Sequence, residues 1–390
     1  DLHSFPTRRS SDLQLALHLS VSRVEKFNAC PFAQFVAYGL RPQPVIPYAV
    51  TAPDMGNIMH TLIERIFKWT ETYDQTLDTL SAEERGALIQ TFLNDLIQNT
   101  HDAVFDSSGQ FRYRGRQLRR IGETTLAALS AQMAKGTFVY RDSEYFFKEP
   151  LTIGGDGKAA EFRGFVDRID SFSDGEDTFV KVIDYKSSDH DLDAAEIYYG
   201  LSLQLLIYMG IGLKVCGEKE KAALPGAAFY FKMDDPMVKG NRENEVESLV
   251  MRINALKPQG IYLDDARVLS ALDDGSDKAI KSFKKSYQNK IRHYSRQDFE
   301  ALIHFAEHHV TEGAKAMLAG DIGVRPYKLG NDSSCTFCDY RGICGYDAQI
   351  DRQACRQLEK VKRETLIEKA TALTTEAAED QKEQDNAMDD

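Results

Sequence analysis

The sequence has no apolar run approaching the roughly 18–20 residues that span a membrane, and its N-terminus lacks the apolar segment of a signal peptide. These two absences favour a soluble, cytoplasmic protein. The sequence also contains no G-x-x-x-x-G-K-[ST] motif, so we expect no ATP hydrolysis within this chain. Because the chain begins at Asp1 and not at methionine, we expect it to be a fragment or a processed product.

Cysteine is scarce in this chain, which has six in 390 residues. Half of them nevertheless fall within the short segment CTFCDYRGIC. In the reducing cytoplasm, clustered cysteines are more often metal ligands or catalysts than disulfides. The spacing therefore predicts a metal centre ligated by Cys335, Cys338 and Cys344.

Such a centre needs a fourth ligand. Cys30, in NACPF, is the first candidate, and Cys355 is the alternative because it lies close to the other three in sequence. Cys216 ends a predicted helix and is a poorer choice. Spacing alone does not separate a zinc site from an iron–sulfur cluster, since both accept four cysteinates.

Basic residues are outnumbered, with 48 Lys and Arg against 60 Asp and Glu, which argues against a nucleic-acid partner. The acidic segment 371–390 supplies half of the net charge of −12, with seven acids and one lysine. Two segments, RYRGRQLRR and KAIKSFKKSYQNKIRHYSR (278–296), instead mix positive charge with aromatic rings, as nucleic-acid-binding surfaces do. A solvated helix face explains either segment equally well. The candidate DNA contacts in the first segment are Arg112, Arg114, Arg116, Arg119 and Arg120.

The order of the predicted elements indicates an α/β fold. Helical patterns occupy 19–30, 54–73 and the region up to about 138, and helices dominate again from about 245 to 320. Between them we expect strands at 143–153, 161–172, 178–188 and 226–235, with a long helix over 192–217. We interpret 1–13 as a disordered or non-native leader, 14–350 as one domain, and 351–390 as a helix fading into an acidic, disordered tail.

Two carboxylates and a lysine fall on consecutive predicted strands, in GFVDRID and VIDYKSS. Asp184 and Lys186 are two residues apart and so share one face of their strand, and a hairpin can bring Asp167 beside them. Carboxylate oxygens suit Mg²⁺, and an ammonium group can stabilise charge that develops on a phosphoryl oxygen. A solvated surface hairpin is the alternative. The apolar neighbours Val180 and Val182 argue against it, because a buried strand does not tolerate charges that have no partner.

Three further polar residues accompany these strands. Gln204 and Tyr208, in QLLIY, are four residues apart and share a face of the helix that follows. His60, in GNIMHTLI, lies on the helix that precedes the strands. Taken singly, each of them is more simply explained by packing in the core.

Taken together, the motifs G-x-x-x-H, G-x-x-D-R-x-D, D-Y-K and Q-x-x-x-Y, in this order over residues 54–235, resemble the RecB-like branch of the PD-(D/E)xK nucleases. The resemblance implies a restriction-endonuclease-like αβββαβ core with helical insertions and Mg²⁺-dependent hydrolysis of DNA. The second acid here is aspartate, where glutamate is commoner in the family. By resemblance the metal ligands are His60, Asp167, Asp184 and the carbonyl of Tyr185, Lys186 is the catalytic lysine, and Gln204 and Tyr208 support the substrate.

One cysteine before this core and three after it resembles the iron–sulfur nucleases, in which a [4Fe–4S] cluster joins the two ends of the domain. Among them, the opening LSVSRVEKFNACPFAQFVAYGL and the strand FYFKMDDPMV are similar to AddB-type subunits of bacterial helicase–nucleases. This implies an exonuclease domain that cuts unwound DNA during recombinational repair of double-strand breaks, beside an AddA-like helicase–nuclease subunit. The alternatives are a stand-alone iron–sulfur exonuclease of the CRISPR-associated type and a zinc-stapled DNA-binding module without catalysis.

Overall fold

The computed structural model describes residues 17–43, 48–100, 104–153, 158–217, 222–239, 245–274 and 293–388. The predicted leader and most of the basic segment 278–296 lie outside these ranges. The chain divides into two compact units, which we describe separately. One, the nuclease unit, comprises 43–145, 165–306 and 360–390, and the other, the cysteine unit, comprises 1–42, 146–164 and 307–359.

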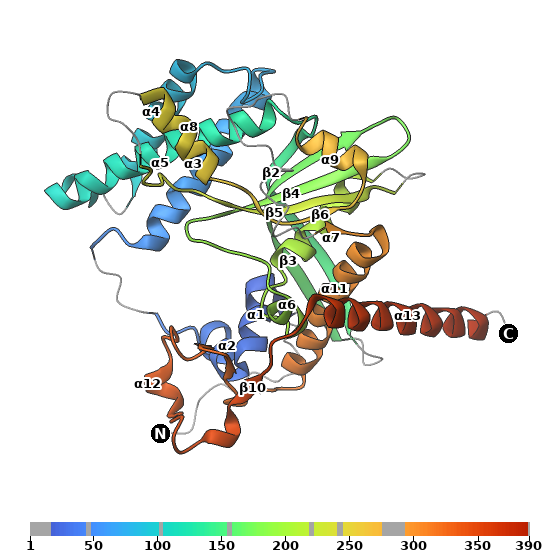
Figure 1. Ribbon diagram of the computed structural model, residues 1–390. Helices are drawn as coiled ribbons and strands as arrows, with labels where there is room; N and C mark the ends of the chain where they lie inside the picture. Colours follow the sequence, from blue (N-terminus) through green and yellow to red (C-terminus); the bar gives the residue numbers. More distant parts are fainter. Residues whose placement is uncertain are drawn as a thin grey trace. The chain divides into compact units, whose positions relative to one another are not determined.

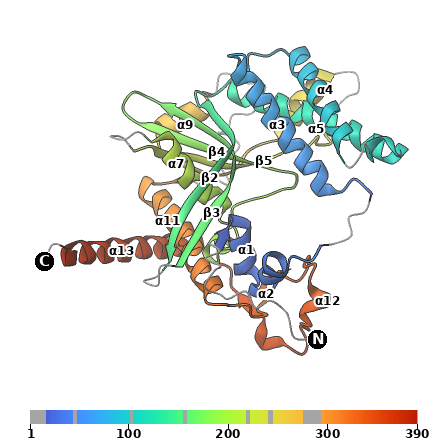
Figure 2. The same cartoon turned by 180° about the vertical axis from the view of Figure 1, so that it is seen from behind.

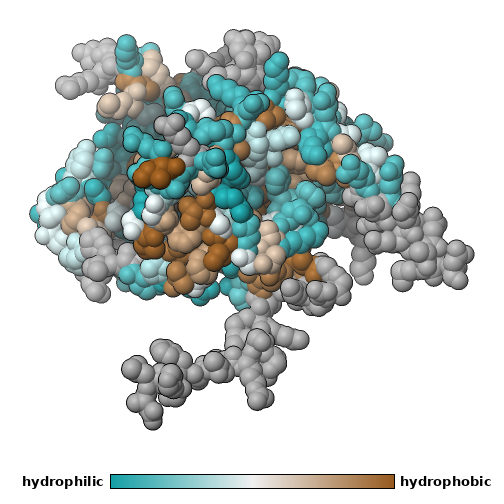
Figure 3. Space-filling model, turned by 90° about the horizontal axis from the view of Figure 1, so that it is seen from below, coloured by the Kyte–Doolittle hydropathy of each residue, from teal (hydrophilic) through white to brown (hydrophobic). Residues whose placement is uncertain are grey.

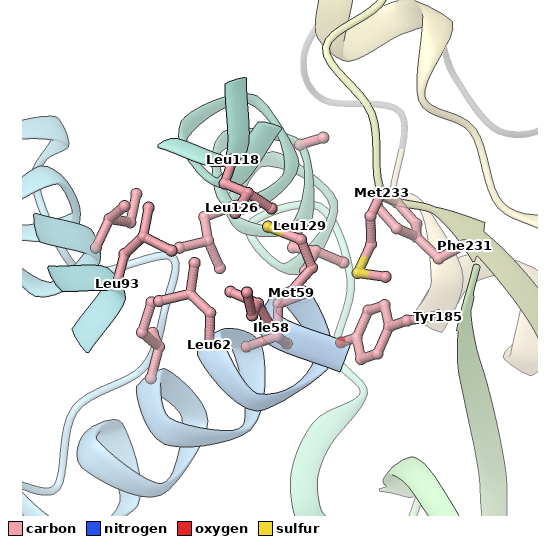
Figure 4. Packing of buried hydrophobic residues seen from close by; sticks show 14 of the residues in the cluster. Ile58, Met59, Leu62, Leu93, Leu118, Leu126, Leu129, Tyr185, Phe231 and Met233 are labelled. Carbon is pink, nitrogen blue, oxygen red and sulfur yellow. The ribbon is translucent and has the colours of Figure 1, made fainter. Parts of the chain in front are cut away.

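Three helices of the nuclease unit pack beside one another (Figures 1 and 2). Each begins at a side chain that accepts a backbone N–H, and in the first two a carboxylate three residues on completes a capping box. Figure 4 shows apolar side chains of the first and third helices meeting between them. The bounds are α3 Ala52–Thr72, α4 Ala82–Asn99 and α5 Gly109–Met133, with the 3₁₀ turn η2 Val104–Asp106 before α5.

The strands of the nuclease unit set the site. β3 pairs antiparallel with β4, β4 pairs parallel with β5, and β5 pairs antiparallel with β6. Two parallel neighbours need a crossover, and helix α7 provides it. The αβββαβ order predicted from the sequence is confirmed. The bounds are β2 Val139–Ile153, β3 Lys158–Ser173, β4 Thr178–Lys186, α7 Gln204–Cys216, β5 Leu224–Lys232, β6 Gln259–Leu263 and β7 His293–Tyr294.

Two expectations about helices are wrong. The helix predicted over 192–217 is two, α6 Ala194–Tyr198 and α7, because Gly200 takes a left-handed φ of 70° that interrupts the helix. The acidic tail predicted to be disordered belongs to helix α13, whose sequence is rich in the good helix formers Ala, Glu, Lys and Gln. The remaining helices are α8 Glu245–Ala255, α9 Ala266–Leu272, α11 Arg296–Leu318 and α13 Arg363–Met388.

The cysteine unit joins segments from both ends of the chain. Its first helix is capped by Ser20, two residues before the Ser22 that the sequence favoured. Strand β1 pairs in parallel with the first part of β3, and a small sheet of order β10–β8–β9 forms the C-terminal part. The bounds are β1 Leu17–Leu19, α1 Val21–Ala29, α2 Pro31–Gln34, η1 Phe35–Leu40, β8 Tyr327–Leu329, β9 Asp332–Ser333, α12 Arg341–Cys344, η3 Arg352–Ala354 and β10 Arg356–Leu358.

Apolar side chains also reach the surface, as they do on most proteins. In the cysteine unit, Phe337 is 95% and Ile350 81% exposed. Figure 3 shows hydrophobic residues gathered on one face of the molecule within a largely polar surface. Across the described residues, every helix is too short or too polar to span a membrane.

Candidate active site

Asp167 on β3 and Asp184 on β4 lie on neighbouring antiparallel strands, as the sequence predicted. The backbone N–H of Tyr185 donates to Asp167 Oδ2 over 2.8 Å, which fixes the first carboxylate against the second strand. His60 on α3 approaches the same oxygen, with its Nδ1 3.3 Å away. The ring of Tyr185 points the other way, into the core (Figure 4). Three elements therefore bring a histidine and two carboxylates together.

Glu144 on β2 belongs to this group, and the sequence analysis missed it. One ligand atom each of His60, Glu144 and Asp167 lies within 4.8 Å of the other two, a spacing that suits a shared metal ion. The backbone of Glu144 is left-handed, with φ at 51°, which is uncommon for a residue other than glycine and is often found at functional sites. The signal in the sequence, one acid among several in RDSEYFFKEP, was too common to single it out.

Burial makes the two aspartates hard to ionise together. Burial and the neighbouring charge of Asp184 raise the pKa of Asp167 to about 8. Burial also raises the pKa of Asp184, although the ammonium of Lys186 opposes the change. For His60, burial disfavours the charged form, but Glu144 and the two aspartates outweigh it and raise the pKa. The site thus gathers oxygen and nitrogen donors whose mutual repulsion a divalent cation would relieve.

Lys186 is held in place by a line of contacts. Its Nζ lies 2.6 Å from Asp184 Oδ2 and donates to Gln204 Oε1 over 2.7 Å. The Gln204 amide in turn donates to the hydroxyl of Tyr208 over 2.9 Å. Both helical residues were predicted to support the substrate, and the structure places them behind the lysine, with Tyr208 buried. They orient the ammonium group, whatever else they touch.

The arginine and second aspartate of GFVDRID form a buried ion pair that the sequence analysis did not interpret. Arg168 donates to both carboxylate oxygens of Asp170, over 2.7 and 2.9 Å, and its guanidinium lies over the ring of Phe67. Lys181 adds a second cation, 2.9 Å from Asp170 Oδ2. Although burial alone would raise the pKa of Asp170, the two cations hold it below its usual value. This network stabilises the strands that carry the site.

Replacing Asp170 by asparagine should therefore lower the free energy of unfolding by about 3–5 kcal/mol, because two cations stay buried without their carboxylate. Urea denaturation measures the change. Glu123→Gln is the matched control: it breaks an exposed pair with Arg119 and should cost less than about 1 kcal/mol. A loss below about 1 kcal/mol in Asp170→Asn would show that the buried network does not hold the strands.

The arginines predicted to contact DNA all lie on or beside the first turns of α5 and have partners within the chain. The guanidinium of Arg116 lies over the ring of Tyr113, and the other four bind a carbonyl or a carboxylate. Arg120 pairs with Asp235, which also binds Arg252. Contact with DNA stays a prediction for this segment, with Arg116 the best placed because its contact is with an aromatic ring and not with an acid.

The cysteine unit brings the four predicted ligands together. The thiol of Cys335 has its pKa raised by burial, and the charges of Cys338, Cys30 and Cys344 raise it further, so all four lie within electrostatic reach. The six cysteines all fall within the described ranges, and each is free of disulfide bonds. The backbone N–H of Tyr346 also donates to the sulfur of Cys344, the kind of contact that tunes a metal-bound thiolate.

Cys30 is fixed from both sides. The guanidinium of Arg356, on β10, donates to the carbonyls of Asn28 and Ala29 just before it. The N–H of Phe32 just after it donates to the carbonyl of Gly323 over 3.1 Å. Cys355 also lies near this region, since its charge acts on Arg356 together with that of Cys30. Cys216 lies in the nuclease unit, beside Arg141 and Asp170.

Comparison with known proteins agrees with this geometry. Residues 18–345 match the PD-(D/E)XK nuclease superfamily. The chain is 31% identical over 365 residues to the B-type subunit of the ATP-dependent helicase/deoxyribonuclease of Alkaliphilus metalliredigens, which covers 90% of this chain and 32% of the relative. The corresponding proteins of Clostridioides difficile, at 28% identity over 94% of this chain and 33% of the relative, and of Clostridium acetobutylicum, at 31% over 86% and 30%, are similar too.

The chain spans about a third of the length of these curated relatives. The superfamily match covers both the helix that carries His60 and the strands that carry Asp167, Asp184 and Lys186. The chain therefore belongs to the PD-(D/E)XK nuclease superfamily, the class of metal-dependent hydrolases that its motifs indicated.

Proposed function

We propose that this chain is the nuclease part of an AddB-type helicase–nuclease subunit and hydrolyses phosphodiester bonds of unwound DNA. The observation that carries the proposal is the convergence of His60, Asp167, Asp184 and Lys186 from three elements on one buried site. The names of its relatives, which describe ATP-dependent helicase/deoxyribonuclease subunits, support a DNA substrate and a helicase partner. A role in recombinational repair and an AddA-like partner subunit belong to the same proposal.

The donor set fits Mg²⁺ or a similar hard cation. His60, Glu144 and Asp167 would hold it, with Asp184 beside them, and the carbonyl of Tyr185 stays a predicted ligand. When bound, such a cation polarises a phosphoryl oxygen and lowers the pKa of a bound water. Oxygen ligands in this mixture favour magnesium or manganese over soft metals.

The chain's own residues do the rest of the work. The ammonium of Lys186, aimed by Gln204, stabilises negative charge that develops on the phosphoryl group or the attacking water. Asp167 is fixed by the N–H of Tyr185, so its position does not depend on the substrate. A site arranged before the substrate arrives needs little reorganisation during the reaction.

In the cysteine unit we propose a [4Fe–4S] cluster held by Cys30, Cys335, Cys338 and Cys344. Their gathering around Cys335 supports a four-thiolate centre, and the resemblance to iron–sulfur nucleases favours iron over zinc. The contacts of Arg356 and Phe32 hold Cys30 at this place before any metal arrives. The cluster would serve as a structural link and not as a redox catalyst.

Cleavage of a labelled single-stranded oligonucleotide by the purified 390-residue chain tests the proposal. We expect shortening products in Mg²⁺ and none in EDTA, while binding persists in Ca²⁺. A chain that binds the oligonucleotide but leaves it intact in Mg²⁺ and Mn²⁺ would point to the DNA-binding module instead. Products released one nucleotide at a time from an end would identify an exonuclease.

A further inference from the structure

A pocket of about 260 Å³ adjoins the catalytic lysine, and its lining includes none of the proposed metal ligands. It lies entirely within the nuclease unit, at the ends of β4 and β5 and beside the loop before β6. The proposed chemistry uses only Lys186 at its edge. We call it the β4–β5 pocket, and its lining is Lys186, Ser188, Asp189, His190, Asp191, Tyr230, Lys232, Ala255, Lys257 and Gln259.

Strand register places this pocket next to the reacting groups. In the parallel pair, Asp184 lies opposite Tyr230 and Lys186 lies opposite Lys232. Because side chains alternate between faces, Tyr230 and Lys232 share the face of the catalytic pair. The intervening residue Phe231 and its neighbour Met233 point into the core instead (Figure 4). Neighbouring strands are about 4.8 Å apart, so the two lysine backbones lie side by side.

The pocket offers the groups that recognise a nucleotide. Lys232 and Lys257 supply positive charge beyond Lys186, and Lys232 already holds a carboxylate oxygen of Asp189 at 3.1 Å. The Asp189 side chain is 92% exposed, so a phosphate oxygen can take its place at little cost. The exposed ring of His190 lies 5.6 Å from the buried ring of Tyr230, which supports it from behind. A supported, exposed ring is a platform on which a base can stack.

We propose that the β4–β5 pocket binds the nucleotide adjacent to the scissile phosphate of a single DNA strand, with its phosphate on Lys232 and its base against His190. This rests on the proposed nuclease function and adds to it a subsite that sets how the strand is aligned. A base must be unstacked from its duplex to reach such a ring, so the pocket selects unwound DNA.

Equilibrium binding without catalysis tests this inference. Anisotropy of a labelled oligothymidine in Ca²⁺ should show about three- to tenfold weaker binding in Lys232→Ala, with a salt slope smaller by about one. His190→Ala should weaken binding about fivefold, and His190→Phe should restore it because the stacking face returns. Lys315→Ala, which removes an exposed lysine on α11, should change nothing. In Mg²⁺, KM should rise more than kcat falls in both alanine variants.

The outcomes separate the pocket from the nuclease assignment. Unchanged binding and KM in Lys232→Ala and His190→Ala, in a chain that cleaves DNA, would overturn the pocket alone. Weakened binding in a chain that does not cleave would keep the pocket and reject the nuclease. Free thymidine monophosphate distinguishes the two sources of a nucleotide. If it competes as well as the oligothymidine and is equally sensitive to both variants, the pocket holds released product and the strand subsite is overturned.

Discussion

Replacing Lys186 by alanine is expected to slow Mg²⁺-dependent cleavage of single-stranded DNA by about 10²–10³-fold or more, the typical effect of removing one preorganised charge-stabilising group. The ammonium lies between Asp184 and Gln204, so the substitution removes the charge at the point where these contacts aim it. Binding in Ca²⁺ should fall far less, because contacts to phosphates elsewhere carry most of the affinity. Single-turnover cleavage and anisotropy measure the two effects.

Two further variants sharpen this result. Gln204→Ala should slow cleavage by less than Lys186→Ala, since it removes the group that aims the lysine and leaves the charge. Lys186→Arg keeps the charge but not the compact geometry, and should recover little activity. Cleavage by Lys186→Ala within about tenfold of the unmodified chain would remove the lysine from the mechanism. The exposed Lys315→Ala again serves as the control.

Replacing Cys30 by alanine is the second change with a large expected effect. We expect loss of the broad visible absorption of an iron–sulfur cluster, a lower melting temperature and weaker DNA binding, although residue 30 lies in a different unit from the catalytic residues. A link from Cys30 to Cys335 closes a loop of about 300 residues, and the chain-entropy value for such a link is about 5–6 kcal/mol. That is an upper bound, because the unfolded chain keeps some structure.

The structure lowers this bound further. Arg356 and the backbone of Phe32 still join the same two segments when the thiol is removed. We therefore expect Arg356→Ala, which loses those carbonyl contacts, to lower the melting temperature even before the metal content changes. Arg356→Lys should restore part of it.

The other cysteines provide the controls. Cys216→Ala should keep colour and stability, because it ends α7 in the nuclease unit. Loss of colour in Cys355→Ala, with colour kept in Cys30→Ala, would show that Cys355 is the fourth ligand. A colourless chain with stoichiometric zinc would keep the link and reject the iron.

The order of elements and the motif residues could be predicted from sequence because each carried a local signal. Asp184 and Lys186 alternate on a strand otherwise made of buried apolar residues, and Gln204 and Tyr208 share one helical face. Their convergence needs only one hairpin and one crossover helix. Such short connections leave few alternative arrangements.

What could not be predicted depends on distant segments. Glu144 joins the site through the path of β2, and its acid-rich surroundings gave no contrast. The break before α7 depends on the conformation of Gly200, which the strong helical pattern on either side concealed. The β4–β5 pocket depends on the register that sets Lys186 beside Lys232, and register is not visible in either strand alone.

The most direct test of the central claim is Mg²⁺-dependent cleavage by Asp167→Asn, measured together with Mn²⁺ binding by electron paramagnetic resonance. The substitution keeps the shape of the side chain and its place beside Tyr185, but removes the charge that the metal requires. We predict that cleavage and tight Mn²⁺ binding are lost together while the melting temperature of the metal-free chain is kept. Cleavage at the unmodified rate, with Mn²⁺ still bound, would contradict the assignment of this site as the nuclease centre.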